Sequence, residues 1–345
     1  MKISKDDFKS AAFEILPNEE QVEAIWQSME RRTASVSQFN LAHVIYYFGA
    51  LIVISAMGWY MTEGWESFGG LGIAAISLAY AISFFFSGRA LWNRERLAVP
   101  GGLLLTLAAW MAPLIVYGIE RATGLWPQGD PGVYRGYHIW VKGSWFTMEV
   151  ATIMASVVLL KFYRFPFLTF PAAFSLWYMS MDLTPLFFSK TDFTWDQRLW
   201  VSLLFGLAML LVSFVIDRRT KEDFAFWGYL FGTLAFWSGL SLIGSESESG
   251  KFLYCLINVG LIFLSVLLKR RVFIVFGALG VSGYLAHLSD VLFKDSWLFP
   301  FALSAIGLLI IYLGVQFQRH QAAAERMVMS LIPAGARSLL PQNRR

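Results

Sequence analysis

Residues 41–62 place the strongest constraint on what this chain can fold into. The stretch reads LAHVIYYFGALIVISAMGWYMT and contains no Asp, Glu, Lys or Arg. An α-helix rises about 1.5 Å per residue, so a run of this length crosses a hydrocarbon core of roughly 30 Å. The bilayer core has no water to satisfy backbone amides and carbonyls, so such a run must be helical. The stretch therefore predicts a membrane-spanning α-helix.

Nine further apolar stretches follow this first one. They cover residues 69–87, 99–120, 144–160, 165–183, 199–216, 224–244, 252–268, 272–293 and 297–317. Composition agrees, because 57% of the residues are apolar and only 15% are charged, against about a quarter charged in soluble domains. The sequence thus predicts an all-α fold, a polytopic transmembrane helical bundle of about ten spans.

The positions of Lys and Arg predict the orientation of these spans. If the N-terminus is cytosolic, the loops after spans two, four, six and eight are cytosolic and hold eleven Lys or Arg, whereas the five opposite loops hold seven over more residues. Positive charge in short loops marks the cytoplasmic side. We therefore expect both termini in the cytosol and the chain in the bacterial cytoplasmic (inner) membrane. The net charge of +4 reflects this topology, and no nucleic-acid partner is expected.

Three segments follow from this topology. Residues 1–38 predict a cytosolic helical hairpin, because Asn18 has the position of a helix cap and apolar residues recur at helical spacing on both sides of Pro17. Residues 39–317 form the transmembrane domain, and residues 318–345 a basic cytosolic tail. No cleavable signal precedes residue 41, so the first span acts as an uncleaved anchor. The expected partners are the lipid bilayer and a possible cytosolic protein bound through residues 1–38.

Glycines within the spans predict where helices pack closely. Gly228 and Gly232 are spaced four residues apart, and Gly277, Gly280 and Gly283 follow in a later span. Small residues let two backbones approach where lipid supplies no hydrophobic drive for association. Two prolines inside spans, Pro113 and Pro171, are candidates for broken helices beside a cavity.

Ionisable residues in or near spans are the candidates for function, since they are costly in a bilayer. Glu149 and Asp182 lie in the fourth and fifth spans, and His287 and Asp290 lie three residues apart on one face of the ninth. The predicted topology places all four toward the non-cytosolic side. Together they predict a site for a cation, a proton or a small cationic solute. The alternative is that they are unrelated residues at wet span ends.

Motifs of soluble enzymes are not found in the sequence. It has no phosphate-binding glycine loop, nucleophile elbow, zinc-protease helix or paired CxxC motif. With one cysteine, Cys255, the chain cannot form an intramolecular disulfide. We predict no catalytic residue, no cofactor and no metal ligand.

The layout resembles a bacterial family of predicted integral membrane proteins of unknown function. The residues that carry the resemblance are Phe48-Gly49-Ala50-Leu51 through Gly58-Trp59, and Arg319-His320 through Leu339-Leu340-Pro341. The family has a short cytosolic helical N-terminus, a multi-span core and a basic Leu/Pro tail. The resemblance implies this location and architecture, and it implies no activity.

Three functions are compatible with the sequence. The first is a non-enzymatic multi-pass membrane protein, such as a scaffold or sensor, that binds a cytosolic partner through residues 1–38. The second is a small-solute or cation transporter using Glu149, Asp182, His287 and Asp290. The third is a membrane-embedded enzyme for a lipid-linked substrate, with loop 121–144 and its Asp130, Arg135 and His138 over the site.

Overall fold

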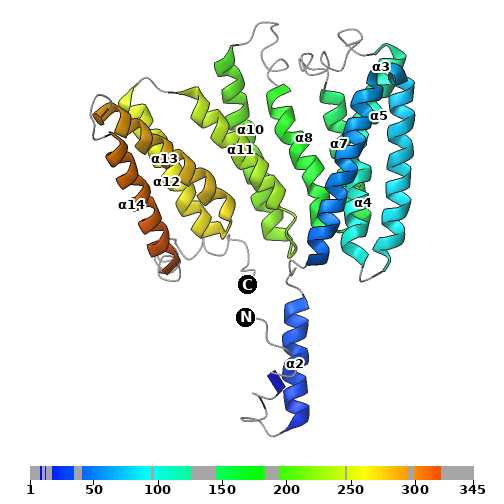
Figure 1. Ribbon diagram of the computed structural model, residues 1–345, viewed down its shortest axis with the longest axis horizontal. Helices are drawn as coiled ribbons and strands as arrows, with labels where there is room; N and C mark the ends of the chain where they lie inside the picture. The colour runs from blue at the N-terminus through cyan, green and yellow to red at the C-terminus, as the bar shows by residue number, and fades with distance from the viewer. Residues whose placement is uncertain are drawn as a thin grey trace. The chain divides into compact units, whose positions relative to one another are not determined.

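The computed structural model describes residues 8–9, 12, 18–34, 41–94, 97–125, 145–182, 194–244, 247–293 and 299–319. Every regular element in these ranges is helical (Figure 1), as the sequence predicts. The elements in chain order are α2 (Glu19–Ala34), α3 (Leu41–Trp92), α4 (Ala98–Trp110), α5 (Ala112–Thr123), α7 (Phe146–Phe162), the 3-10 turn η2 (Pro166–Leu168), α8 (Thr169–Asp182), α10 (Trp195–Arg219), α11 (Phe226–Ile243), α12 (Glu248–Leu268), α13 (Arg271–Phe293) and α14 (Phe299–Arg319).

The chain divides into two units, residues 1–53 and 54–345. In the first unit, the Asn18 side chain caps α2 by accepting a hydrogen bond from the Glu20 amide at 3.0 Å. Phe8 packs on Trp26 with a ring-centroid distance of 5.4 Å, and Lys9 Nζ lies 2.9 Å from a Glu23 carboxylate oxygen. Both contacts join residues 8–9 to α2.

Six helical segments in the described ranges are long and apolar enough to cross a membrane. They are Ser67–Trp92, Ala98–Thr123, Trp195–Arg219, Phe226–Ile243, Glu248–Leu268 and Arg271–Val291. They correspond to predicted spans two, three and six to nine, and they indicate a membrane protein. The other four predicted spans fall on the first half of α3, on α7, on η2 with α8 and on α14, which lie outside this set of six.

The boundary between the first two predicted spans differs from the expected turn. Residues 63–68 are helical, and the interruption falls at Gly69, whose φ of 59° and ψ of −176° leave the helical region. Glycine adopts this conformation without the steric penalty that a Cβ brings. Nothing in residues 63–68 other than Gly64 disfavours a helix, so the helix continues to the next glycine.

Proline shapes two of the remaining spans. The predicted span 99–120 consists of α4 and α5, separated at Met111, because Pro113 has no N–H with which to continue the hydrogen-bond ladder. Pro171 lies in the first turn of α8, just after the 3-10 turn η2, where a missing N–H is tolerated. The broken helix is therefore found at Pro113, and Pro171 lies at a helix start.

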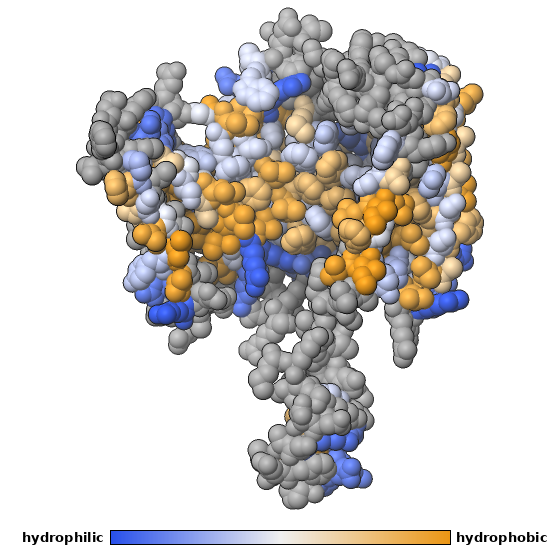
Figure 2. All heavy atoms as spheres, viewed as in Figure 1, coloured by the Kyte–Doolittle hydropathy of each residue, from blue (hydrophilic) through white to orange (hydrophobic). Residues whose placement is uncertain are grey.

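The distribution of polarity in α10 is that of a helix in lipid. Small and polar residues occupy its buried face, and large apolar residues occupy its exposed face. The buried set includes Ser202, Gly206, Ser213 and Asp217, and the exposed set includes Leu204, Leu207, Leu211 and Val215. Figure 2 shows exposed apolar side chains of the second unit as a broad orange band with hydrophilic residues below it. Water would disfavour this surface, whereas hydrocarbon stabilises it.

Helices of the second unit pack in antiparallel pairs that are joined side by side. The sequence neighbours α7 and α8, α10 and α11, and α12 and α13 form the pairs; α11 also contacts α8 and α13, and α5 contacts α7. Glycine lies at the closest approaches. A Cβ added at Gly118 of α5 would lie 2.6 Å from the Ala74 nitrogen of α3, and one at Gly277 of α13 would lie 2.6 Å from the Asn258 carbonyl oxygen of α12.

The predicted packing glycines are confirmed at four of five positions. Gly228 faces Ser213, Gly232 faces Met209, and both Gly277 and Gly280 face Asn258. A Cβ added at Gly283 would have no atom within 4 Å, so close packing does not require a glycine at this position.

We expect Gly206→Leu to separate α10 from α11. A Cβ at Gly206 would overlap the Phe236 nitrogen and lie 2.8 Å from the Gly232 carbonyl oxygen. Overpacking of this kind costs about 1–3 kcal/mol, so the melting temperature of the detergent-solubilised protein should fall by several degrees. Gly260→Leu on α12 is the matched control, because nothing lies within 4 Å of that position. Equal melting temperatures for the two variants would contradict this packing.

Candidate functional site

A cavity of about 280 Å³ lies among α4, α5, α7 and α8 and contains the predicted site residue Glu149. Glu149 is 5% exposed and lies in the first turn of α7. Pro113, at the break between α4 and α5, also lines this cavity, as expected for a proline beside a site. We call this space the Glu149 cavity.

Aromatic rings form much of the wall of the Glu149 cavity. Trp145 from the start of α7 stacks on Tyr178 of α8, with a centroid distance of 5.9 Å and an interplanar angle of 8°. Trp110 of α4 lies 5.2 Å from Phe174 of α8. All four rings line the cavity. Aromatic ring faces carry negative electrostatic potential and attract cations.

Hydroxyl groups continue the polar surface down one face of α7. Thr152 and Ser156 follow Glu149 by three and seven residues, which places all three on one side of the helix. Their exposures are 2% and 0%. Thr152 donates to the Met148 carbonyl at 2.7 Å, whereas the Ser156 hydroxyl has no hydrogen-bond partner in the described structure. The buried face of α7 is thus polar over two turns.

Asp182, the second predicted site residue, is the last residue of α8. Its side chain lies outside the part of the chain that the structure describes.

His287 lines a second cavity, of about 380 Å³, among α10, α11, α12 and α13. Its Nε2 lies 3.3 Å from a Glu248 carboxylate oxygen, which Lys251 Nζ also contacts at 2.7 Å. Lys251 lines the same cavity. The carboxylate nearest His287 is thus shared with a lysine, and a mobile cation would meet an ammonium group there.

The structure does not bring the four predicted site residues into one cavity. The linings of the two cavities have no residue in common. Asp290 is exposed, three residues beyond His287 on α13, and lines neither of them. Asp130, Arg135 and His138 of the long loop lie outside the described residues.

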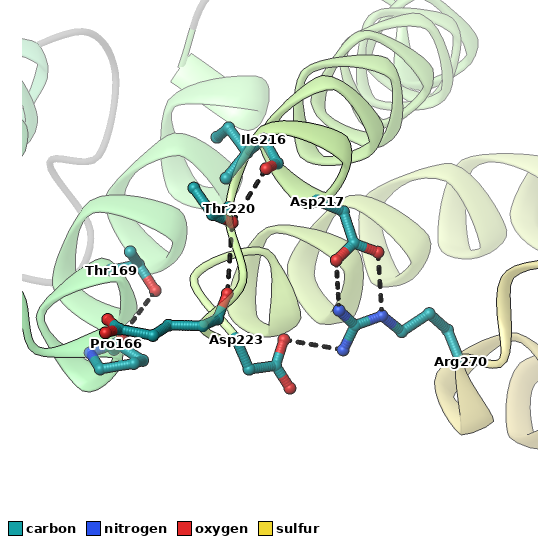
Figure 3. Close-up of polar contacts among 8 residues, drawn as sticks. Pro166, Thr169, Ile216, Asp217, Thr220, Asp223 and Arg270 are labelled. Atoms are coloured by element: carbon teal, nitrogen blue, oxygen red, sulfur yellow. Dashed lines mark hydrogen bonds and ion pairs between the residues drawn. The ribbon is translucent and has the colours of Figure 1, made fainter. Parts of the chain in front are cut away.

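A buried ion-pair cluster joins α10 to the turn between α12 and α13 (Figure 3). The Arg270 guanidinium donates to both carboxylate oxygens of Asp217, through Nη2 at 2.6 Å and Nε at 3.2 Å, and to Asp223 through Nη1 at 2.7 Å. Asp217 is 4% exposed. The Arg270 guanidinium also lies 5.4 Å from the Tyr229 ring centroid.

Electrostatics keep this arginine charged. Burial lowers the pKa of Arg270, but hydrogen bonds and charges from Asp217 and Asp223 outweigh burial and raise it above its usual value. Because the pKa of Arg270 is raised in the folded state, the stability that its charge contributes is present at neutral pH and is lost as the pH rises into strong alkali. Sequence reasoning missed this cluster, because Asp217 is followed by two arginines and its true partner is 53 residues away.

Neither a metal cluster in the described residues nor a known relative points to a function for this protein. Among the residues that the structure describes, no three His, Cys, Asp or Glu side chains are placed to hold a metal ion. Comparison with protein-family models, curated proteins and solved structures finds no match for this chain. The functional argument therefore rests on the geometry of the cavities.

We expect Arg270→Gln to destabilise the protein strongly, because Asp217 would stay buried without its guanidinium. Breaking a buried pair at one partner costs about 3–5 kcal/mol. In a double-mutant cycle with Asp217→Asn, the double variant should lose less stability than the sum of the singles. Lys251→Gln, which breaks an ion pair to the exposed Glu248, is the control and should unfold like the wild type. Additive losses would contradict a coupled pair.

Proposed function

We propose that this protein is a multi-pass protein of the bacterial cytoplasmic membrane, with about ten spans and both termini in the cytosol, that binds and transports a small organic cation. The observation that carries the proposal is Glu149, a carboxylate buried among aromatic rings inside an apolar helix bundle. Ionisable residues at such positions mark ion and solute paths more often than structural sites.

The proposed topology is supported by the contacts at one end of the bundle. Arg164, which follows α7, lines one cavity with Arg219 and Lys221, which follow or end α10. Arg270, between α12 and α13, bonds to Asp217 at the end of α10. The basic loops after predicted spans four, six and eight therefore gather at the same end, as alternating spans require, and their positive charge favours the cytosolic side for that end.

Cation binding is the chemistry that the Glu149 cavity favours. A carboxylate supplies a full negative charge, and aromatic faces attract a cation by about 0.5–2 kcal/mol each, more strongly when water is excluded. The volume of about 280 Å³ lies at the small end of the range for ligand cavities. A compact ammonium compound the size of choline satisfies charge, shape and volume together.

Transport, beyond binding, is favoured by the polar face of α7. The hydroxyls of Thr152 and Ser156 extend from Glu149 along a helix whose opposite face is apolar, with Met154 and Val158 exposed. The Ser156 hydroxyl is fully buried and has no hydrogen-bond partner in the described structure. These hydroxyl oxygens follow the Glu149 carboxyl group along α7 and supply polar contacts for a solute that moves along this helix.

The cytosolic residues 1–38 are proposed as the contact for a partner protein. Ile25 on α2 is a large apolar residue that is 40% exposed. Deletion of residues 1–35 separates this role from transport. Cation binding should survive the deletion, whereas a scaffold or sensor would lose its partner.

We expect choline to bind the purified protein in lipid nanodiscs and Glu149→Gln to abolish that binding, since the amide carries no charge. Isothermal titration calorimetry measures the affinity, with 3,3-dimethylbutanol as a neutral compound of the same shape. The neutral compound should bind at least tenfold more weakly. Uptake of labelled choline into proteoliposomes then tests transport.

Two variants of the other predicted residues serve as matched controls. His287→Gln and Asp290→Asn should bind choline as the wild type does, because neither residue lines the Glu149 cavity. Equal binding of the charged and neutral compounds, or equal loss in the Asp290 variant, would refute the cation site. Binding without uptake would refute transport alone.

A further inference from the structure

A third cavity, of about 620 Å³, lies where α7, α8 and α10 end or begin. Three cationic side chains line it: Arg164 after α7, Arg219 at the end of α10, and Lys221 in the α10–α11 turn. One carboxylate, Glu222, also lines it, so two positive charges remain in excess. We call this space the basic cavity.

The three cations form no ion pair in the part of the chain that the structure describes, whereas the nearby Arg270 bonds to both Asp217 and Asp223. These two carboxylates are thus already paired, and Glu222 alone offsets one of the three charges in the cavity. Three like charges in one concave space repel one another, and an anion would relieve that repulsion.

The threonine hydroxyls of the basic cavity do not compete for the cations. Thr169 donates to the Pro166 carbonyl at 2.7 Å, and Thr220 donates to the Ile216 carbonyl at 2.9 Å or the Glu222 carbonyl at 3.2 Å (Figure 3). Their protons are committed to the backbone, which fixes the turns that carry the cations. The charged side chains are therefore the donors available to a ligand.

Apolar residues complete the wall of the basic cavity. Leu160 of α7, Ile216 of α10 and Phe224 of the α10–α11 turn line it beside the cations. In the proposed topology this end of the bundle faces the cytosol, and basic pockets between helices on that side bind the headgroups of anionic lipids. Guanidinium groups match phosphate oxygens with paired, charge-assisted hydrogen bonds.

We propose that the basic cavity binds a phosphate-bearing anion. Two sources share this chemistry: the headgroup of an acidic phospholipid, with its acyl chain along the apolar wall, and a water-soluble phosphate compound. The site is separate from the Glu149 cavity, with which it has no lining residue in common. Its function does not depend on cation transport.

Native mass spectrometry of the purified full chain tests the proposal. Phosphatidylglycerol, phosphatidylcholine and glycerol phosphate are titrated separately. Phosphatidylglycerol bound in preference to phosphatidylcholine, with Arg219→Gln lowering its affinity five- to tenfold, would support the lipid source. Glycerol phosphate bound with the same sensitivity to Arg219→Gln would support the soluble source. Arg219→Lys, which keeps the charge, should restore most of the affinity.

Arg218→Gln is the matched control. Arg218 is adjacent to Arg219 and exposed like it, lies 5.9 Å from the Phe214 ring and does not line the cavity. Its loss should change the affinity less than twofold. Equal effects of the Arg218 and Arg219 variants, equal binding of the acidic and zwitterionic lipids, or no binding of any compound to the wild type would overturn the proposal.

Discussion

In a lipid bilayer no hydrophobic effect drives apolar helices together. The contacts between helices in this chain therefore depend on positions where two backbones can approach closely. Glycine provides those places at Gly118 against α3, at Gly206 and Gly232 between α10 and α11, and at Gly277 against α12. Polar side chains reinforce them. Asn258 is fully buried, accepts a hydrogen bond from Trp237 and lies against Gly280. Close packing of this kind is what holds the cavity walls in place.

Two kinds of buried charge follow from that packing. Asp217 and Arg270 neutralise each other at one end of the bundle, where they tie α10 to the α12–α13 turn. Glu149 lies instead beside a cavity lined largely by aromatic rings. The first arrangement answers a structural need, because the desolvated pair satisfies itself. The second joins an acidic side chain to a cavity large enough for a small ligand, and the proposed cation binding is based on this combination.

The sequence predicts the helical fold, the membrane environment and the packing glycines, because lipid imposes these as local patterns of hydropathy and residue size. It also predicts the break at Pro113 and gives Glu149, which lines a cavity, as a candidate site residue, since each is costly in a span wherever it lies. It does not predict that Trp110, Trp145 and Tyr178 surround Glu149, or that Arg270 reaches Asp217. Those contacts depend on which helix faces meet, and helical periodicity says little about that in uniformly apolar spans. Because the sequence does not show which helix faces meet, it predicts one site for Glu149 and His287. The structure places them in separate cavities.

The central claim is that the Glu149 cavity admits water and selects cations, and charge-selective thiol modification tests it most directly. Cys255, the only cysteine, is replaced by Ser, and Thr152→Cys is compared with Met154→Cys, which lies on the exposed apolar face of the same helix. In nanodiscs, a trimethylammonium methanethiosulfonate should modify the Thr152 variant at least tenfold faster than a sulfonate reagent does, and this preference should disappear with Glu149→Gln. The Met154 variant should react slowly with both. Equal rates for the two reagents at position 152, or no reaction there in a folded protein, would contradict the account.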